Sequence, residues 1–402
     1  MADIFRLHNQ VKHYEWGCTD HIPRLLGIPG DGRPWAELWM GSHPGSPSLV
    51  SLDTGDISLG DLIARDNRRW LGEAAAERFG TLPFLFKLLA AESPLSIQAH
   101  PNLAQAREGF DRENRAGIPI DAPSRNYKDP NHKPEIICAL TPFTGMCGLR
   151  SPGEIQELLA AFLTSAPAVL HEYLAPLSRA LQASDTTTAL QDFLTTLLNL
   201  PPVGRQALTG YITSMNAPSN SDTGYEWELI RRFACQYPGD PAVIAPLYLN
   251  VFRLEPGEAI FLDAGVPHAY IRGFGVELMA NSDNVLRGGL TAKHIDIPEL
   301  MKVLDMRPQQ PQILKPQPQQ CYTYPSPCSE FSLTVIQGSG PMIPFTPDSP
   351  SICIVTEGKA VIPGSKDLVL AAGESVFIPP AAAHQEAAAL QGQFTMYAAS
   401  CN

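Results

Sequence analysis

Two segments of the chain repeat one pattern, and this repeat restricts the fold more than any other feature. In the first copy, Gly257 and a glutamate precede an apolar run, a tight turn and His268. In the second copy, Gly373 and a glutamate precede the same arrangement, which ends at His384 with the same spacing. A glycine turn, an inward-facing strand and a second turn deliver a histidine to the inside of a small barrel. The repeat therefore predicts two β-barrels in one chain.

Composition agrees with this prediction and excludes several classes of protein. The 402 residues include 38 Pro and 31 Gly, which favour many turns, and 44% of the residues are hydrophobic, which excludes a disordered chain. The net charge of −12 argues against a nucleic-acid-binding protein, because neutralisation of phosphates requires a basic face.

The lack of recognisable targeting signals and the pattern of the cysteines predict a cytoplasmic location. No apolar run approaches the length of about 18 residues that a membrane span requires, so no membrane association is expected. The first residues lack a basic segment followed by an apolar one, which is the pattern of a secretory signal. The eight cysteines are scattered without a CxxC pair, and we expect them to be reduced thiols.

A helical block interrupts the β-like regions. Ser151 and Glu154 have the spacing of a helix capping box, and Pro152 occupies the first helical position. Apolar residues at helical spacing predict helices at 155–163, 190–198 and 226–235. The Pro/Gln-rich stretch 308–320 has no such periodicity and marks a boundary. The predicted domains are a first barrel made of 1–150 and 240–307, a helical domain at 151–239, and a second barrel at 308–402.

Four side chains carry the donor atoms of a metal site. Gln98 and His100 stand two positions apart in a strand-like run, so both project to one face. Glu135 precedes a second apolar run, and His268 follows the turn of the first repeat. An amide oxygen, two imidazoles and a carboxylate suit zinc, although other divalent ions accept the same donors. If the four side chains converge, they form a site for one divalent cation.

The chain resembles two families, one contained in the other. The glycine–histidine repeat resembles the second motif of the cupins, which are small β-barrels or jelly rolls. The larger part of the chain resembles the type I phosphomannose isomerases, most specifically in Ser-Ile-Gln-Ala-His at 96–100 and Ser-Asp-Asn-Val-Leu-Arg at 282–287. The second of these motifs belongs to a longer matching segment, 277–293, and the other matching segments are 35–44, 82–87, 131–135 and 265–270.

This resemblance implies a fold, a cofactor and a reaction. The fold is mainly β with a helical insertion, in which two cupin-like β-barrels flank an α-helical domain. One Zn²⁺ per chain is held by Gln98, His100, Glu135 and His268. The reaction is the reversible interconversion of mannose 6-phosphate and fructose 6-phosphate, and Arg287 occupies the position of the family's active-site arginine.

Aldose–ketose isomerisation moves a proton between carbons 1 and 2 through a cis-enediol, so the site requires a base, an enediolate stabiliser and a phosphate anchor. For the base, Lys133, Glu277 and a metal-bound water remain alternatives. Arg287 suits an enediolate or a phosphate, because guanidinium offers two parallel donors. Asp283 is expected to orient Arg287 or a nearby lysine. The residues predicted to bind the sugar phosphate are Ser96, Lys87, Tyr270, Lys293, Asp283, Glu37 and Trp16.

Two other classes of protein compete with an isomerase. A cupin that binds sugar without catalysis is disfavoured because all four ligands are present, and an iron-dependent cupin oxygenase is disfavoured because the set has only two imidazoles. The second barrel has no Gln-x-His strand, so we expect no metal at His384. A monomer is expected. Mannose catabolism and the supply of GDP-mannose are both open as pathways.

Overall fold

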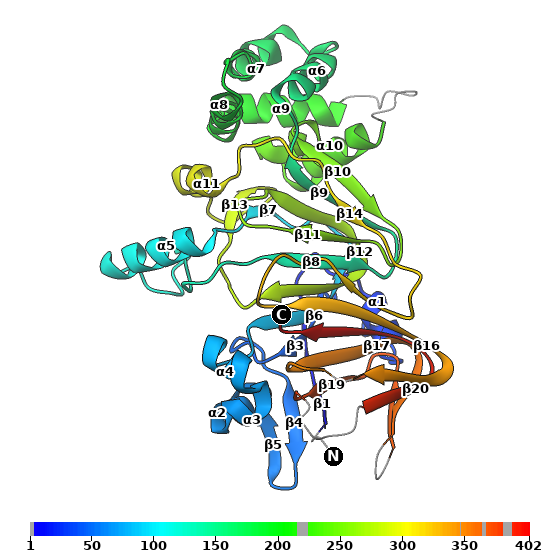
Figure 1. Ribbon diagram of the computed structural model, residues 1–402. Coiled ribbons are helices and arrows are strands. Elements are labelled where there is room, and N and C mark those ends of the chain that lie inside the picture. The colour runs from blue at the N-terminus through cyan, green and yellow to red at the C-terminus, as the bar shows by residue number, and fades with distance from the viewer. Residues whose placement is uncertain (1–3, 215–223, 346, 364–366, 381–387) are drawn as a thin grey trace.

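The described residues form two large antiparallel sheets, a small sheet of β4 (Leu49–Leu52) and β5 (Gly55–Ser58), and a helical block (Figure 1). The structure is a computed structural model that describes residues 4–214, 224–345, 347–363, 367–380 and 388–402. Along the long axis of the molecule, the helical block comes first, an eleven-stranded sheet follows, and a seven-stranded sheet lies at the other end. Further helices flank both sheets, so the architecture is mixed α and β, with more helix than the predicted mainly β fold.

The eleven-stranded sheet gathers strands from distant parts of the sequence. Its strands are β2 (Gln10–Lys12), β3 (Glu37–Gly41), β6 (Phe84–Ala91), β7 (Ile97–Ala99), β8 (Glu135–Ala139), β9 (Phe143–Leu149), β10 (Leu249–Leu254), β11 (Ala259–Leu262), β12 (His268–Ala280), β13 (Leu286–Gly289) and β14 (Ile313–Leu314). Strand β12 connects the two parts of this sheet. Its first residues pair with β7 and β9, and its later residues pair with β6 and β8.

The seven-stranded sheet is built mainly from the C-terminal part of the chain. Its strands are β1 (Phe5–Arg6), β15 (Cys321–Tyr324), β16 (Ser332–Phe345), β17 (Ser351–Ile362), β18 (Leu368–Ala371), β19 (Ser375–Ile378) and β20 (Ala388–Ser400). The N-terminal β1 pairs with β19, whereas β14, in the Pro/Gln-rich stretch, pairs with β11 of the other sheet. The N-terminal β1 therefore joins the seven-stranded sheet, and the Pro/Gln-rich stretch that contains β14 joins the eleven-stranded sheet.

The helical block lies where the apolar periodicity predicts it. It consists of α6 (Pro152–Leu163), α7 (Ala168–Ala180), α8 (Thr186–Leu198), α9 (Pro202–Ser214), α10 (Gly224–Gln236) and the 3-10 helix η1 (Pro241–Leu247). Ser151 and Glu154 form the predicted capping box at the start of α6. Buried residues such as Phe193 and Phe233 share one apolar core with Ile271 of β12, so the block is fixed to the eleven-stranded sheet.

Six further helices lie outside this block. They are α1 (His21–Leu25), α2 (Leu59–Arg65), α3 (Asn67–Leu71), α4 (Glu73–Phe79), α5 (Leu103–Arg115) and α11 (Ile297–Val303). Helices α2 to α4 were not predicted, although each of the first two has a sequence signal. Ser58 accepts a hydrogen bond from the backbone of Asp61, and Asp66 accepts one from Arg69, so both cap a helix start.

The glycine turns of the repeat are confirmed in both copies. Gly257 and Gly373 have φ of 86° and 85°, in the left-handed region that glycine adopts without strain. The first turn leads into β11 and then to His268, and the second leads into β19. His384, at which no metal is expected, lies outside the described residues.

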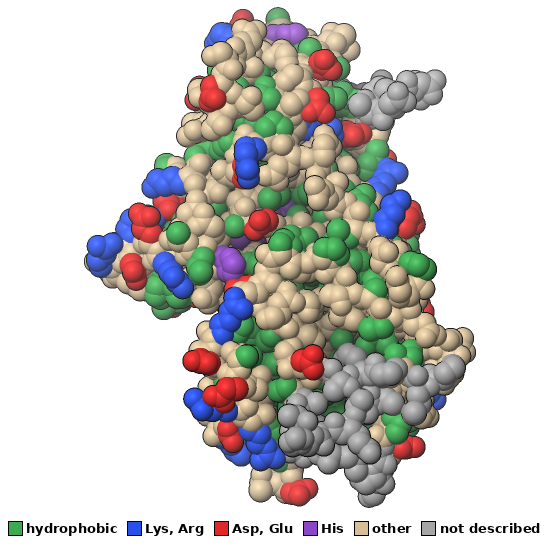
Figure 2. Space-filling model, viewed as in Figure 1, with side chains coloured by type: hydrophobic (Ala, Val, Ile, Leu, Met, Phe, Trp, Pro, Cys, Tyr) green, Lys and Arg blue, Asp and Glu red, His purple; other side chains and the backbone are tan. Residues whose placement is uncertain are grey.

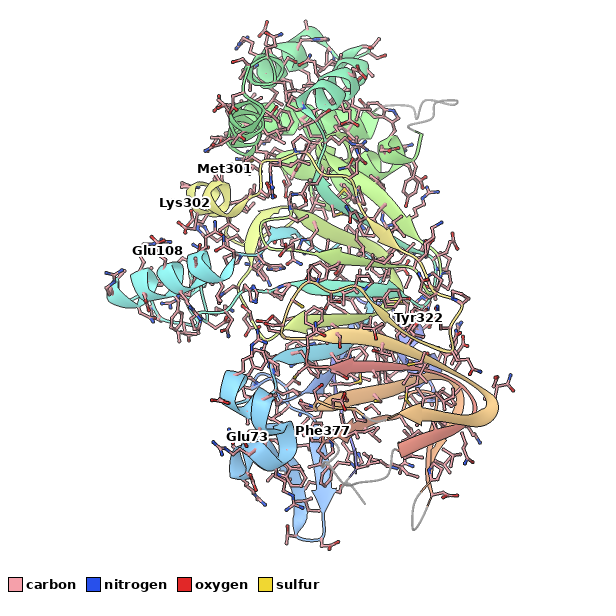
Figure 3. All side chains as sticks on the ribbon, in the orientation of Figure 1. Glu73, Glu108, Met301, Lys302, Tyr322 and Phe377 are labelled. Atoms are coloured by element: carbon pink, nitrogen blue, oxygen red, sulfur yellow. The ribbon has the colours of Figure 1, made fainter. Side chains whose placement is uncertain are left out.

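The main apolar core lies between the two sheets. It joins Phe86 and Leu278 of the first sheet to Leu333 and Phe377 of the second, and each of these side chains is fully buried. Figure 3 shows Tyr322 at the junction of the two sheets and Phe377 beside the short helices α3 and α4. Because this core continues through both sheets, the seven-stranded sheet stabilises the strands that carry the site described below.

The visible surface carries charges of both signs. Figure 2 shows acidic and basic side chains interspersed over α5 and over α2 to α4, without one continuous basic face on this side of the molecule. In the part of the chain that the structure describes, none of the helices has the length and apolarity needed to cross a membrane.

Phe331 tests the contribution of the core between the sheets. Its side chain is 0% exposed, and its ring centroid lies 6.4 Å from that of Phe261 on β11. We expect Phe331→Ala to lower the free energy of unfolding by about 3–5 kcal/mol, because a buried aromatic is replaced by a cavity. Urea unfolding measures this loss. Val369→Ala on β18, where the side chain is 43% exposed, is the control and should change stability little. Equal stability of both variants would contradict a shared core.

Candidate metal centre

Strand pairing brings the four predicted metal ligands to one place in the eleven-stranded sheet. Gln98 on β7 is the Cα partner of His268, the first residue of β12. His100 directly follows β7, and Glu135 is the first residue of β8. Gly265, with φ of 79°, allows the turn that leads into His268. Each ligand therefore stands at the end of a strand, where neighbouring strands fix the backbone.

The carboxylate of Glu135 lies between two imidazoles. Its Oε1 is 3.5 Å from His100 Nε2, and its Oε2 is 3.4 Å from His268 Nε2. The amide nitrogen of Gln98 is 3.3 Å from His268 Nε2. His100, Glu135 and His268 are no more than 1% exposed, and their donor atoms lie within 4.8 Å of one another. The structure thus brings together the residues that the sequence predicts.

Both imidazoles turn a lone pair toward the carboxylate. His100 Nδ1 lies 2.7 Å from the carbonyl oxygen of Asn284, and His268 Nδ1 lies 2.9 Å from that of Val266. A carbonyl only accepts, so each Nδ1 donates its proton and each Nε2 is left as an acceptor. This tautomer is the one that binds metals through Nε2.

The local electrostatics fit a cation among these donors. Burial and the nearby Lys133 together lower the pKa of His100 to about 4, so this imidazole is neutral at pH 7. Burial raises the pKa of Glu135, but the ammonium of Lys133, whose Nζ is 2.8 Å from Oε1, shifts it well below its ordinary value. His100 Nε2 and Glu135 Oε2 are buried without a hydrogen-bond partner. A divalent cation would satisfy these acceptors together.

A second buried charge cluster lies beside the ligands. Lys87 Nζ is 2.8 Å from Glu277 Oε2 and 3.7 Å from Glu37 Oε1, and the three side chains are 3–6% exposed. Lys87 and Glu277 are Cα partners on β6 and β12, so the sheet fixes their contact. Burial raises the pKa of Glu277, and the carboxylates of Glu135 and Glu37 raise it as well, against the effect of Lys87. Glu277 therefore accepts a proton more readily than an exposed glutamate.

A group of cations without partners borders the site. Arg287 on β13 is the Cα partner of Gln98, and burial lowers the pKa of its guanidinium. Burial also lowers the pKa of Lys293, and repulsion from Arg287 and from Lys128 lowers it further. Within the described residues, no carboxylate lies in ion-pair distance of Arg287, Lys293 or Lys128. This corner of the site is open to an anion.

The remaining predicted residues lie around these groups. The Tyr270 hydroxyl is buried without a hydrogen-bond partner, and burial raises its pKa well above the ordinary value. Ser96 is half-buried directly before β7, and Trp16 stacks on Tyr14 with ring centroids 5.6 Å apart. Asp283 was expected to orient Arg287 or a nearby lysine, but among the described residues its ion pair is with His43. Its Oδ2 lies 3.5 Å from His43 Nε2, and this contact is the main cause of its lowered pKa.

The sequence prediction missed three residues that hold the site together. Asn284 is 0% exposed and accepts the His100 proton through its carbonyl, while its side chain bonds to the backbone of Lys128 and Asn131. His132 Nε2 lies 2.9 Å from Glu330 Oε1. Asn284 and His132 lie inside motifs that define the resemblance, but Glu330 carries no local signal because its partner is 198 positions away.

Comparison with known proteins identifies the family. Residues 4–152 match the phosphomannose isomerase type I catalytic domain. The chain is 43% identical over 379 residues to the mannose-6-phosphate isomerase of Escherichia coli, covering 93% of this chain and 94% of that one. It is 36% identical over 385 residues to the mannose-6-phosphate isomerase of Bos taurus, covering 88% of each. The chain belongs to the type I phosphomannose isomerase family, as the sequence motifs predict.

Solved structures agree over the full length. A crystal structure of mannose 6-phosphate isomerase described as holo and zinc bound matches with a TM-score of 0.87 at 38% identity, covering 100% of both chains. A crystal structure of a point mutant of phosphomannose isomerase from Salmonella typhimurium matches with a TM-score of 0.88 at 38% identity, again covering 100% of both chains. The fold of this chain is therefore that of the family throughout.

Glu330 gives a pH-dependent test of the contact with His132. Burial raises the pKa of Glu330, but the contact with His132 outweighs this and lowers it to about 2. A depressed carboxyl pKa stabilises the fold above the unfolded pKa of about 4.3, and this stabilisation is lost as pH falls toward 2. We expect the melting temperature of Glu330→Gln to fall less between pH 5 and pH 3 than that of the wild type. The exposed Glu172→Gln is the control, and parallel curves for all three proteins would contradict the contact.

Proposed function

We propose that the chain interconverts mannose 6-phosphate and fructose 6-phosphate reversibly, with one Zn²⁺ as cofactor. The observation that carries this proposal is the buried set of His100, Glu135 and His268, with two imidazole lone pairs facing one carboxylate, beside cations that have no ion-pair partner among the described residues. The name of the Escherichia coli relative and the zinc in the matching holo structure support the substrate and the metal.

Gln98, His100, Glu135 and His268 would hold the zinc ion. The amide nitrogen of Gln98 now donates toward His268, and a half-turn of the amide would present its oxygen instead. A bound divalent ion polarises a carbonyl or hydroxyl oxygen as a Lewis acid and neutralises charge that develops on it. Backbone carbonyls orient both imidazoles in advance, which reduces the reorganisation that binding requires.

Among the alternatives for the base, the charge arrangement favours Glu277. Its raised pKa brings it closer to neutrality, where a general base works best. Lys133 forms an ion pair with Glu135 at 2.8 Å, which fixes its side chain beside the ligands and suits it to stabilise negative charge on the substrate. Lys87 orients the Glu277 carboxylate and keeps it available for proton transfer between carbons 1 and 2.

The other predicted residues fit contacts to the sugar phosphate. Arg287 and Lys293 would bind the phosphate, because both are cations without a carboxylate partner among the described residues. The unpartnered hydroxyl of Tyr270 fits a hydrogen bond to a sugar hydroxyl. Further contacts are proposed for Ser96, Glu37, Asp283 and Trp16.

The division of the chain is also a proposal. We infer two cupin-like barrels, made of 1–150 with 240–307 and of 308–402, on either side of a helical domain at 151–239, with β1 and β14 as exchanged strands. A cytoplasmic location is supported by the absence of disulfides among the eight cysteines, which all lie in the described parts of the chain. A monomer without a nucleic-acid partner is proposed from the sequence, and mannose catabolism and GDP-mannose supply stay open.

Removal of the metal tests the cofactor. We expect turnover of mannose 6-phosphate to be lost after chelation and restored by Zn²⁺, because the chain's own residues supply no other Lewis acid to the reacting oxygens. Arg287→Ala should keep one zinc per chain by atomic absorption and still lose turnover, whereas Gln98→Ala should lower the zinc content. Full turnover in zinc-free protein, or none in folded zinc-loaded wild type, would contradict the proposal and favour a sugar-binding cupin.

Substitution of Glu277 tests the base. Glu277→Gln keeps the shape of the side chain but removes proton acceptance, so we expect kcat to fall by about 10²–10⁴-fold while zinc content is unchanged. Exchange of the proton at carbon 2 of mannose 6-phosphate with deuterated water, followed by NMR, should fall in parallel. Glu172→Gln, on the surface of α7, is the control. A kcat within a few fold of the wild type would exclude Glu277 as the base.

A further inference from the structure

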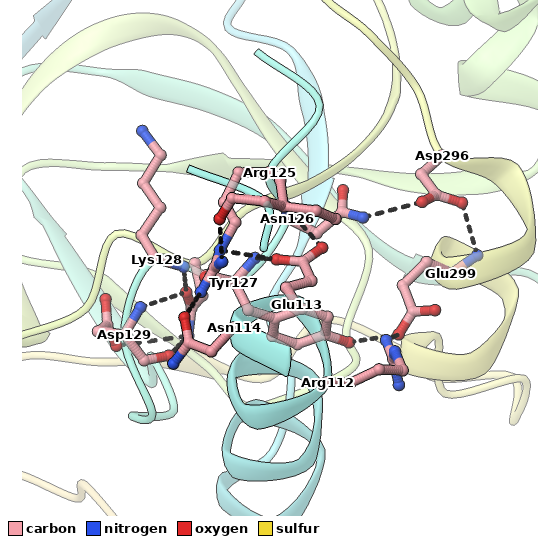
Figure 4. A network of polar contacts seen from close by, with 12 residues as sticks. Arg112, Glu113, Asn114, Arg125, Asn126, Tyr127, Lys128, Asp129, Asp296 and Glu299 are labelled. Atoms are coloured by element: carbon pink, nitrogen blue, oxygen red, sulfur yellow. Dashed lines mark hydrogen bonds and ion pairs between the residues drawn. The ribbon is translucent and has the colours of Figure 1, made fainter. Parts of the chain in front are cut away.

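Two networks of hydrogen bonds fix the backbone around Lys128, and neither of them involves its ammonium group. On one side, Tyr127 donates its hydroxyl to Glu299 at 2.8 Å and its backbone N–H to Glu113 at 2.9 Å. Figure 4 shows this network between α5 and α11, with the Lys128 side chain directed away from it and its amine joined to none of the drawn residues. The backbone of Lys128 is therefore held while its side chain reaches outward.

The second network of hydrogen bonds joins the backbone of Lys128 to the segment that leads to Arg287. The Lys128 N–H donates to Asn284 Oδ1 at 2.7 Å, and the Asp283 N–H donates to Asp129 Oδ2 at 2.7 Å. Asn284 is buried, and its carbonyl accepts the Nδ1 proton of His100. The buried Asn284 thus fixes both the imidazole of His100 and the backbone of Lys128.

Among the described residues, no carboxylate lies in ion-pair distance of Lys128, although Lys128 is near enough to help lower the pKa of Asp283. Lys128 and Arg287 both lower the pKa of Lys293, so the three cations are near enough to repel one another. The nearby Asp283 forms its ion pair with His43, and Asp296, at the start of α11, accepts hydrogen bonds from Asn126 and Glu299. In a chain with a net charge of −12, three neighbouring cations without an ion-pair partner in the described residues cost free energy, and a dianion would offset it.

We propose that Lys128 binds the phosphate of the substrate together with Arg287 and Lys293, and that it contributes to the preference for phosphorylated sugars. This inference rests on the proposed function, because it assigns a further residue to the same site. Arg287 supplies a planar guanidinium, whereas the two lysines supply point charges that follow the phosphate oxygens as the sugar changes shape. Lys128 does not touch the reacting carbons and acts in binding.

The test compares Lys128→Met with Lys128→Arg in the zinc-loaded enzyme. Methionine keeps the length of the side chain without its charge. We expect the KM for mannose 6-phosphate to rise about tenfold and kcat to stay within about twofold, and inhibition by inorganic phosphate to weaken by a similar factor. Lys128→Arg should restore most of the affinity. The control is Lys359→Met, an exposed lysine on β17, which should match the wild type.

Two results would overturn the assignment. An unchanged KM and an unchanged phosphate inhibition constant in Lys128→Met would exclude the contact, and so would a fall in kcat at constant KM. Lys128→Gln provides a second neutral variant if the methionine variant does not fold. If the zinc-loaded wild type has no turnover, the proposed function fails, but calorimetric titration with inorganic phosphate still tests Lys128. Equal phosphate affinities in wild type and variant would then exclude it.

Discussion

The hydrogen-bonded register of strand β12 is the constraint on which the site depends. Its first residue, His268, pairs with Gln98 of β7, and nine positions later Glu277 pairs with Lys87 of β6. A ligand pair and a charge pair are therefore set by one strand. A slip of one residue would turn both His268 and Glu277 to the opposite face, so the apolar core that fixes the register also fixes the chemistry.

The buried charges next to the metal ligands are tolerated because each lies against a charge of opposite sign. Lys87 lies between Glu277 and Glu37, and Lys133 lies against Glu135. Breaking such a pair leaves an uncompensated buried charge, which costs about 3–5 kcal/mol. The exception is the corner around Arg287, where cations face no carboxylate among the described residues. The contrast separates the part of the site that is neutralised by the protein from the part that is suited to an anionic ligand.

The sequence predicted correctly those features that depend on interactions between residues close together in the chain. The capping box at Ser151, the glycine turn at Gly257 and the common direction of Gln98 and His100 follow from contacts within a few residues. The short length of β7 (Ile97–Ala99) and the contact of Asp283 with His43, in place of the expected Arg287 or a nearby lysine, were not predicted. These outcomes depend on partners far away in the chain, which periodicity and spacing do not encode. The proposed phosphate-binding role of Lys128 was not predicted from the sequence for the same reason.

The seven-stranded sheet also takes part in the site, although its predicted barrel was expected to hold no metal. Glu330, two residues before β16, contacts His132, which adjoins Lys133 and thus the ion pair with Glu135. The core between the sheets holds this contact in place, because Phe331 is fully buried next to Glu330. A change in the C-terminal region can therefore alter the position of Lys133 without touching a ligand. The packing of the seven-stranded sheet against the eleven-stranded sheet therefore contributes to the position of Lys133.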